Sequence, residues 1–271
     1  MTATETIVGL SLVDVTVRFG GHTAVNGLTL DAPCGVITGL IGPNGAGKTT
    51  TFNVCSGLLR PSAGRVRLFG EDVSRLGPAA RARRGLGRTF QRMELYDSMT
   101  VAENVMTGRE AALAGANPLR HLWGSHRERT DTERCVGEAL ARCGLVDVAD
   151  EPVAMLSTGQ RRLVELARAL ATGARLLLLD EPSSGLDPSE SAGFGQILRN
   201  VVAAGSGILL IEHDMSLVMG VCDYIHVLDF GLAIFEGTPG EVHDSATVRA
   251  AYLGDASGLA GERAGSPRKA G

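Results

Sequence analysis

The chain has 271 residues, which is enough for one large domain or for a core with an inserted subdomain. Its 26 basic and 30 acidic residues leave a net charge of −4, and this balance argues against a protein that coats nucleic acid, although a local basic patch remains compatible with it. The five cysteines are dispersed and show neither CxxC nor zinc spacing, which favours a reduced cytosolic compartment over a disulfide framework or a metal site.

Residues 1–9 have neither the basic region nor the apolar region of a secretory signal. No uncharged apolar run reaches the ~18 residues that a membrane-spanning helix needs. We therefore expect a chain with no signal peptide and no transmembrane segment.

The first predicted elements are strands around a glycine-rich turn. Apolar residues alternate over 10–19, which predicts a half-buried strand, and 35–41 is a short apolar run that ends in the turn. A helical pattern follows Lys48 and is closed by Pro61, and the apolar residues of 66–69 predict a further strand.

The pattern then changes. Residues 93–158 contain no convincing strand, helical patterns cover 100–108 and 132–143, and the segment 109–134 is polar and rich in turn formers. Four apolar runs follow, at 175–179, 207–212, 225–228 and 233–235. Runs this uniformly apolar are typical of strands buried on both faces, as in a parallel sheet covered by helices.

These patterns predict an α/β fold with a mostly parallel core sheet. The core is assigned to 1–92 and 159–254, and an inserted helical subdomain to 93–158. The Gly/Ala-rich segment 255–271 is predicted to be a disordered tail.

A phosphate-binding loop is the strongest motif in the chain. Residues 42–49 satisfy G-x-x-x-x-G-K-[ST] between a predicted strand and a predicted helix. Glycines let backbone N–H groups close around phosphate oxygens, Lys48 reaches the β- and γ-phosphates, and the Thr49 hydroxyl ligates Mg²⁺. All other basic residues except Lys269 are arginines, so a chance match is improbable. The sequence predicts a nucleoside triphosphate site made of Gly42, Pro43, Asn44, Gly45, Ala46, Gly47, Lys48, Thr49 and Thr50.

Two carboxylates end the apolar run at 175–179. Asp180 is suited to hold Mg²⁺, and Glu181 is suited to polarise the attacking water as a general base. In isolation they could be ordinary loop residues, but a phosphate-binding loop in the same chain favours the catalytic interpretation. No lysine is left for an Asn-Lys-x-Asp element, which argues against guanine specificity.

The segment from 156 onwards identifies the type of ATPase. Ser157 and Gln160 form a capping-box pattern, and an apolar stripe follows on the helix that they begin. A plain helix start explains both residues, but Leu-Ser-Thr-Gly-Gln closely resembles the signature motif of ATP-binding cassette (ABC) ATPases. In that family the motif faces the γ-phosphate bound by a second protomer, so the resemblance implies a role in trans for Ser157, Gly159 and Gln160. Thr158 departs from the glycine or larger residue common at its position, which varies in the family.

Further family elements occur in the expected order over residues 7–254. The resemblance implies that Phe19 stacks on adenine, although Phe19 also continues the apolar face of its strand. It implies that Gln91 contacts Mg²⁺ and the water region, that Asp187 lies in the D-loop, and that His213 touches the γ-phosphate. It also implies an N-terminal antiparallel β subdomain beside the P-loop NTPase core.

More specific phrases resemble the ATPases of branched-chain amino acid transporters. They are 88–91, 96–105, 211–215, 237–242 and 251–254, together with the polar insertion after Arg109. The resemblance implies the ATP-hydrolysing subunit of a bacterial importer, peripheral at the cytoplasmic face of the inner membrane, that takes up branched-chain amino acids or related small organic solutes. Its implied cofactors are ATP and Mg²⁺. Its implied partners are a second, identical or related ATPase, membrane permease subunits and, indirectly, a periplasmic or extracellular solute-binding protein.

Two other functions predict different sequence features. A soluble ABC-type machine acting on nucleic acid predicts a second cassette, a long coiled coil or a basic linker, and the sequence shows none of them. A regulatory subunit that binds ATP without hydrolysing it is disfavoured by Glu181 and His213. Residues 229–231 spell the kinase tripeptide Asp-Phe-Gly, but they lie between two late strands and are predicted to form a hairpin turn.

Overall fold

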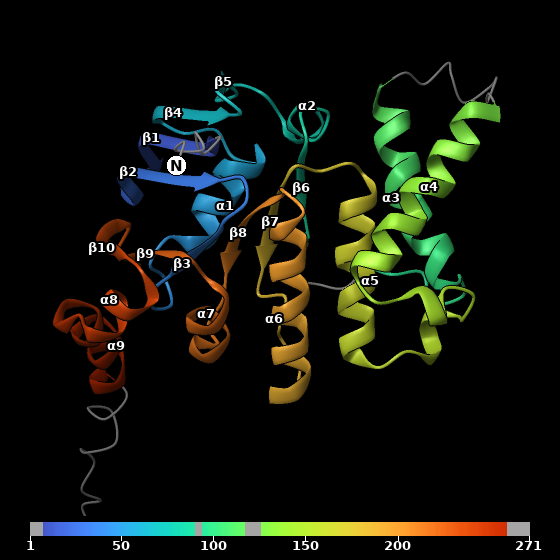
Figure 1. Ribbon diagram of the computed structural model, residues 1–271. Coiled ribbons are helices and arrows are strands. Elements are labelled where there is room, and N and C mark those ends of the chain that lie inside the picture. Colours follow the sequence, from blue (N-terminus) through green and yellow to red (C-terminus); the bar gives the residue numbers. More distant parts are fainter. Residues whose placement is uncertain (1–7, 90–93, 117–125, 259–271) are drawn as a thin grey trace, which may run out of the picture.

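The protein is described by a computed structural model that covers residues 8–89, 94–116 and 126–258 (Figure 1). Its strands form two sheets. The antiparallel sheet has the order β2-β1-β4-β5, with β1 at Val8–Phe19, β2 at His22–Pro33, β4 at Ala63–Leu68 and β5 at Glu71–Asp72. The larger sheet has the order β10-β9-β3-β8-β7-β6, with β3 at Ile37–Ile41, β6 at Leu86–Arg88, β7 at Leu176–Asp180, β8 at Gly207–Ile211, β9 at Tyr224–Asp229 and β10 at Leu232–Gly237. Only the β9–β10 pair of this sheet is antiparallel, which confirms the predicted α/β class with a mostly parallel core.

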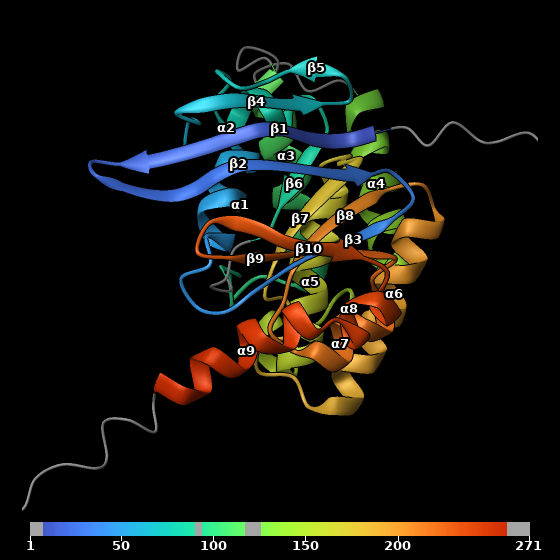
Figure 2. The ribbon, with the colours of Figure 1, turned by 90° about the vertical axis from the view of Figure 1, so that its left-hand side faces the viewer.

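Helices cover the larger sheet, and some of them extend the molecule beyond the sheet on one side. They are α1 at Lys48–Ser56, α2 at Pro78–Ala82, α3 at Val101–Ala116, α4 at His126–Arg142, α5 at Thr158–Ala171, α6 at Pro188–Ala203, α7 at Met215–Val221, α8 at Pro239–Asp244 and α9 at Ala246–Gly258. Figure 2 shows the antiparallel sheet above the core sheet, with α6, α7 and α8 below. None of the helices in the described residues is long and apolar enough to cross a membrane.

The predicted helical insertion contains α3, α4 and two short 3-10 helices in its described part, at Val146–Val148 and Val153–Met155. An isolated bridge between Thr100 and Pro152 joins its entry to its exit. Helix α5 packs against α3 and α4 and also against α6 and β6, so it connects the insertion to the core. The exact boundaries between core and subdomain stay predictions.

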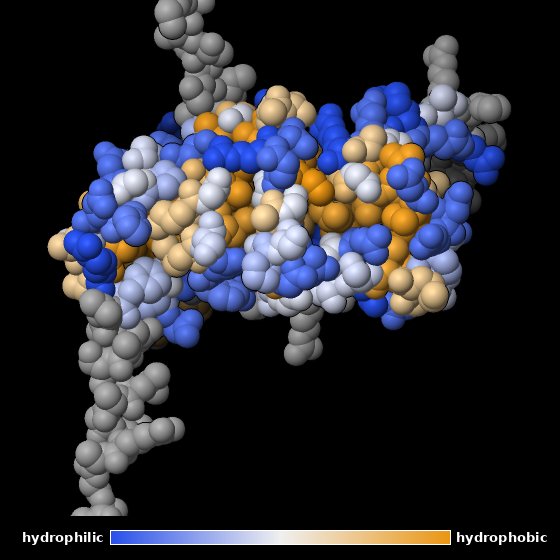
Figure 3. All heavy atoms as spheres, turned by 60° about the horizontal axis from the view of Figure 1, so that its bottom comes forward, coloured by the Kyte–Doolittle hydropathy of each residue, from blue (hydrophilic) through white to orange (hydrophobic). Residues whose placement is uncertain are grey.

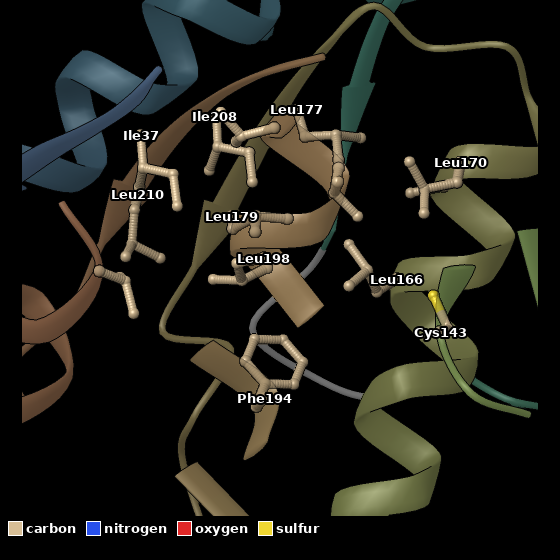
Figure 4. Close-up of a cluster of buried hydrophobic side chains, with 14 of the residues drawn as sticks. Ile37, Cys143, Leu166, Leu170, Leu177, Leu179, Phe194, Leu198, Ile208 and Leu210 are labelled. Atoms are coloured by element: carbon tan, nitrogen blue, oxygen red, sulfur yellow. The ribbon is translucent and has the colours of Figure 1, made fainter. Parts of the chain in front are cut away.

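Strand alternation explains how one sheet carries two hydrophobic clusters. All five residues of β7 are buried, and because successive side chains point to opposite faces, Leu177 and Leu179 join one cluster while Leu176 and Leu178 join the other. Figure 4 shows the first cluster, in which β7 and β8 face side chains of α5 and α6, among them Leu166, Leu170, Phe194 and Leu198. Each fully buried leucine or phenylalanine contributes roughly 1.5–3 kcal/mol, so this packing holds the carboxyl ends of the core strands in place.

Apolar side chains also reach the surface. On the lower side of the molecule they form a broken band between hydrophilic residues (Figure 3). Large apolar side chains that are more than half exposed include Phe19, Leu58, Val146, Met155 and Phe230.

One member of the arginine cluster at 81–84 is fully buried. Arg81 Nη1 donates to the carbonyl oxygens of Val54 and Cys55 at 2.6 and 2.7 Å, and Nη2 donates to Val73 at 2.8 Å. Val54 and Cys55 lie in the last turn of α1, where the helix dipole is negative, so the dipole and the carbonyl oxygens stabilise the buried charge. Arg81 therefore fixes the carboxyl end of the helix that follows the glycine-rich loop.

The chain end differs from the prediction. Helix α9 continues to Gly258, so residues 255–258, predicted as the start of a disordered tail, are helical. Once a helix has begun, each added residue gains a backbone hydrogen bond, which offsets the weak propensity of glycine and serine here. Residues 259–271 lie outside the described range.

Candidate functional site

The glycine-rich loop between β3 and α1 has a backbone that only glycine fits at its two ends. Gly42 has φ 150°, and a Cβ there would lie 2.0 Å from the Leu228 carbonyl oxygen. Gly47 has φ 100°, and its Cβ would lie 2.6 Å from the Ala24 oxygen. Gly47 is also the N-cap of α1 and makes no side-chain cap hydrogen bond, so the first backbone N–H groups of α1 are suited to donate to a bound anion.

Lys48 spans this loop. Its Nζ donates to the carbonyl oxygens of Gly42 at 2.6 Å and of Pro43 at 2.8 Å. The ammonium group thus lies at the loop opening, with Thr49 exposed and Thr50 half-buried beside it on the first turn of α1. The predicted residues 42–50 are therefore continuous in space, with the Lys48 ammonium bound by the carbonyl oxygens of Gly42 and Pro43 beside the first turn of α1.

Asp180 lies at the carboxyl end of β7 and is 6% exposed. Its Oδ2 is 3.7 Å from Nη2 of Arg88. Burial raises the pKa of Asp180, and Glu181 and Glu212 raise it further, whereas Arg88 and Lys48 lower it. A buried carboxyl among two acids and two cations is an environment in which an added divalent cation stabilises the charged form.

Glu181 and His213 are brought together by the parallel pairing of β7 with β8. The Nδ1 of His213 lies 3.8 Å from Oε2 of Glu181, although the two residues are far apart in the sequence. Glu181 has φ 49°, a sparsely populated region for a residue with a side chain, and its N–H donates to the Ile211 oxygen at 2.9 Å. Such a strained backbone is typical of residues held for a functional task.

Glu212 is a functional candidate that the sequence analysis did not single out. It is 1% exposed, and its two oxygens accept from the N–H of Ser183 at 2.8 Å and of His213 at 3.2 Å. It therefore ties the loop after Glu181 to the loop that carries His213. The available signal was an acid at the end of a wholly apolar strand, directly before the candidate histidine.

The predicted capping box at the start of α5 is confirmed. The Ser157 hydroxyl accepts from the Gln160 N–H at 3.2 Å, and the Gln160 side chain accepts from the Ser157 N–H at 3.0 Å. Gly159 packs against α6, because a Cβ on it would lie 2.9 Å from Oε1 of Glu190. In Figure 1 the strands β8 and β7 and helix α6 lie between α1 and α5, so the helix that Ser157 caps is separated from the helix that follows the glycine-rich loop.

The remaining predicted residues lie around these groups. Asp187 is the N-cap of α6, where its carboxylate accepts from Ser189 and Glu190, both at 2.8 Å. Phe19 is the last residue of β1 and is 51% exposed. Gln91 lies outside the described residues.

The sequence profile of the ABC transporter family matches residues 25–184. BraF of Pseudomonas aeruginosa, a high-affinity branched-chain amino acid transport ATP-binding protein, is 37% identical over 251 residues, which cover 91% of this chain and 98% of BraF. LivG of Escherichia coli K12, with the same description, is 37% identical over 252 residues, with the same two coverages. LptB of Acidithiobacillus ferridurans, a lipopolysaccharide export system ATP-binding protein, is 36% identical over 234 residues and covers 86% of this chain and 92% of its own.

Solved structures show the same fold. The ADP conformation of MJ1267, an ATP-binding cassette of an ABC transporter, superposes with a TM-score of 0.81 and 31% identity over 92% of this chain and all of the other. A nucleotide-free ATP-binding cassette from an ABC transporter gives a TM-score of 0.78 and 29% identity over 90% of this chain and 98% of the other.

Proposed function

The chain belongs to the ABC transporter family and is an ABC ATPase, and from this premise we propose that it powers a bacterial importer of branched-chain amino acids or related small organic solutes. The observation that carries the proposal is the extent of the match, since BraF and LivG align along almost their whole length. In this proposal the chain acts peripherally at the cytoplasmic face of the membrane. Other subunits select the solute.

We assign ATP to the loop 42–50 and Mg²⁺ to Thr49, Asp180 and Gln91. Hydroxyl, carboxylate and amide oxygens are the ligands that Mg²⁺ prefers. The raised pKa of Asp180 shows that its charged form is poorly stabilised in the free chain, and a bound cation would stabilise it. The bound ion would neutralise charge that develops on the phosphates. Lys48 binds the phosphates in place of the two carbonyl oxygens that it contacts here.

Hydrolysis is assigned to Glu181 as the general base for the attacking water. His213, whose Nδ1 lies 3.8 Å from the Glu181 carboxylate, orients the water and the γ-phosphate. Glu212 acts as a positioning residue through its bonds to the backbones of both loops.

The site is proposed to be completed by a second ATPase subunit. Ser157, Gly159 and Gln160 form a helix N-terminus with an exposed hydroxyl, which suits the γ-phosphate of a nucleotide bound elsewhere. Because α5 is separated from α1 within one chain, two protomers arranged head to tail would bury two nucleotides between them. Asp187 would lie at the same interface.

Ser157→Arg tests this arrangement. We expect the variant to bind ATP like the parent but to lose hydrolysis, because an arginine blocks the γ-phosphate contact from the partner. In a homodimer, mixing it with Lys48→Ala, which is inactive for a different reason, should restore part of the phosphate release, since one composite site per mixed dimer is intact. If the mixture stays inactive while mixed dimers form on size exclusion, the in-trans role of Ser157 is wrong.

A groove is proposed as the permease docking site. It has a volume of about 1220 Å³ and lies between α2 and β6 on one side and α3 and α5 on the other. Its lining includes Leu58 and Tyr96, which are 57% and 55% exposed. Exposed apolar side chains beside a groove of this size suit an inserted helix of a membrane partner.

Co-purification from membranes tests the importer proposal. The tagged chain should bring down permease subunits, a second ATPase where the pair is heteromeric, and the solute-binding protein. Leu58→Glu should reduce permease recovery at least ~10-fold, because a charged group would be buried in the groove. Val146→Glu is the matched control, since Val146 is 59% exposed and does not line the groove, and it should recover permease like the parent. Recovery of nucleic-acid factors in place of a permease would contradict the proposal.

A further inference from the structure

The turn between β9 and β10 has a residue that its backbone does not favour. Asp229 pairs with Leu232, so the loop consists of two residues, Phe230 with φ 41° and Gly231 with φ 78°. Positive φ at both loop positions is the pattern of a type I′ turn, for which Asn-Gly is preferred. Phe230 occupies the first position, where a side chain beyond Cβ is strained and where no local hydrogen bond compensates as it does for asparagine.

The Phe230 side chain is also almost completely exposed to solvent. It is 85% exposed, more than any other large apolar side chain among the residues that the structure describes. Backbone strain and exposure of an aromatic ring are two separate free-energy penalties for the folded chain, and both arise from the Phe230 side chain. A local rule broken in this way indicates a functional contact that the isolated chain does not make.

The turn is fastened to the phosphate-binding loop. Gly231 N–H donates to the Ala46 oxygen at 3.0 Å, and the Gly231 oxygen accepts from Asn26 N–H at 2.8 Å. A Cβ on Gly47 would lie 3.5 Å from Cα of Gly231. Phe230 is therefore held on a rigid support directly beside the P-loop rather than on a free hairpin tip.

Phe19 approaches the same place from the antiparallel sheet. It pairs with His22 at the end of the β1–β2 hairpin, and Ala24, two residues further along β2, has an oxygen that would lie 2.6 Å from a Cβ on either Gly47 or Gly231. Two strand residues span about 7 Å. Figure 2 shows the β1–β2 hairpin and the β9–β10 turn directed to the same side, with α1 between them in height.

We propose that Phe230 is a second aromatic contact for the adenine ring of bound ATP, across from Phe19. A purine has two faces, and an aromatic ring on each excludes water from both without reading the polar edge of the base. This inference rests on the proposed ATP site, and it assigns base recognition to both hairpins that flank the loop. The favourable contact in the complex offsets the strain that Phe230 imposes on the free chain.

Phe230→Asn separates this role from a structural one. Asparagine suits the first position of a type I′ turn, so the variant should melt at a higher temperature than the parent. Its affinity for a non-hydrolysable ATP analogue should nevertheless fall about 10-fold, as expected for the loss of one base-stacking contact. Its affinity for magnesium tripolyphosphate, which has no base, should not change. Leu232→Asn is the matched control, since Leu232 is the first residue of β10, two positions after Phe230, and is 47% exposed. This variant should bind both ligands like the parent.

Three results would overturn the inference. They are parental affinity of Phe230→Asn for the ATP analogue, an equal loss of affinity for tripolyphosphate, and a defect confined to dimer formation, which would make Phe230 a partner contact. The proposed function fails by a different result, namely a parent chain that neither binds the ATP analogue nor hydrolyses ATP.

Discussion

Glu181→Gln should lower the steady-state ATPase rate by roughly 100- to 10,000-fold, which is the range for the loss of a general base. The glutamine amide has nearly the same shape as the carboxylate but does not accept the proton of the attacking water. ATP binding should persist, because the phosphate site proposed at residues 42–50 does not include Glu181. Phosphate release measured in single turnover and at steady state checks the expected loss.

The same variant should accumulate as a dimer. If hydrolysis separates two protomers that ATP joins, a chain that binds ATP without hydrolysing it stays paired, and size exclusion with Mg²⁺ and ATP should show twice the mass of the sample without nucleotide. Glu133→Gln, on the exposed surface of α4, is the control and should behave like the parent in both assays. A Glu181→Gln chain that hydrolyses ATP at the parental rate would show that Glu181 is not the base.

The proximity of the candidate groups could be predicted because parallel strands end at one edge of a sheet. The loop after β3, the two carboxylates at the end of β7 and His213 after β8 all lie at the carboxyl ends of buried strands, and the uniformly apolar runs identified those strands. The capping pattern at Ser157 was equally local, since both partners lie within one helical turn. Strand ends and helix caps of this kind can be predicted from the sequence.

Contacts between distant segments were not predictable in the same way. Arginine side chains are mostly exposed in proteins, yet Arg81 is buried against the carbonyl oxygens at the end of α1, and the identity of a residue does not show that its backbone carbonyl is a partner. The role of Glu212 was not predictable for the same reason, because its partners are backbone N–H groups in two loops. The turn at Phe230 was predicted, whereas its positive φ and its attachment to Ala46 depend on tertiary packing.

Lys48→Arg should be nearly as damaging as Lys48→Ala, although it keeps the positive charge. Hydrogen bonds from a charged donor contribute about 1.5–3 kcal/mol each, so the loss of two phosphate contacts in Lys48→Ala should weaken ATP binding by ~100-fold or more. In the arginine variant the question is whether a planar guanidinium can reach the same oxygens.

The geometry of the loop argues that it cannot. Lys48 Nζ lies 2.6 and 2.8 Å from two successive carbonyl oxygens, so the opening accommodates a compact ammonium that can rotate its three donors. A guanidinium is wider and holds its donors in one plane, and the loop packs closely against the rest of the chain, because even a Cβ on Gly42 or Gly47 would clash with the backbone oxygens of Leu228 and Ala24. Arg60→Lys, on an exposed residue, is the control for exchange between the two cations and should bind ATP like the parent. If Lys48→Arg binds ATP within a few-fold of the parent, charge alone suffices at this position. If its affinity falls to that of Lys48→Ala, shape decides, which explains why lysine stands at this position of a folded core whose other basic positions are arginines.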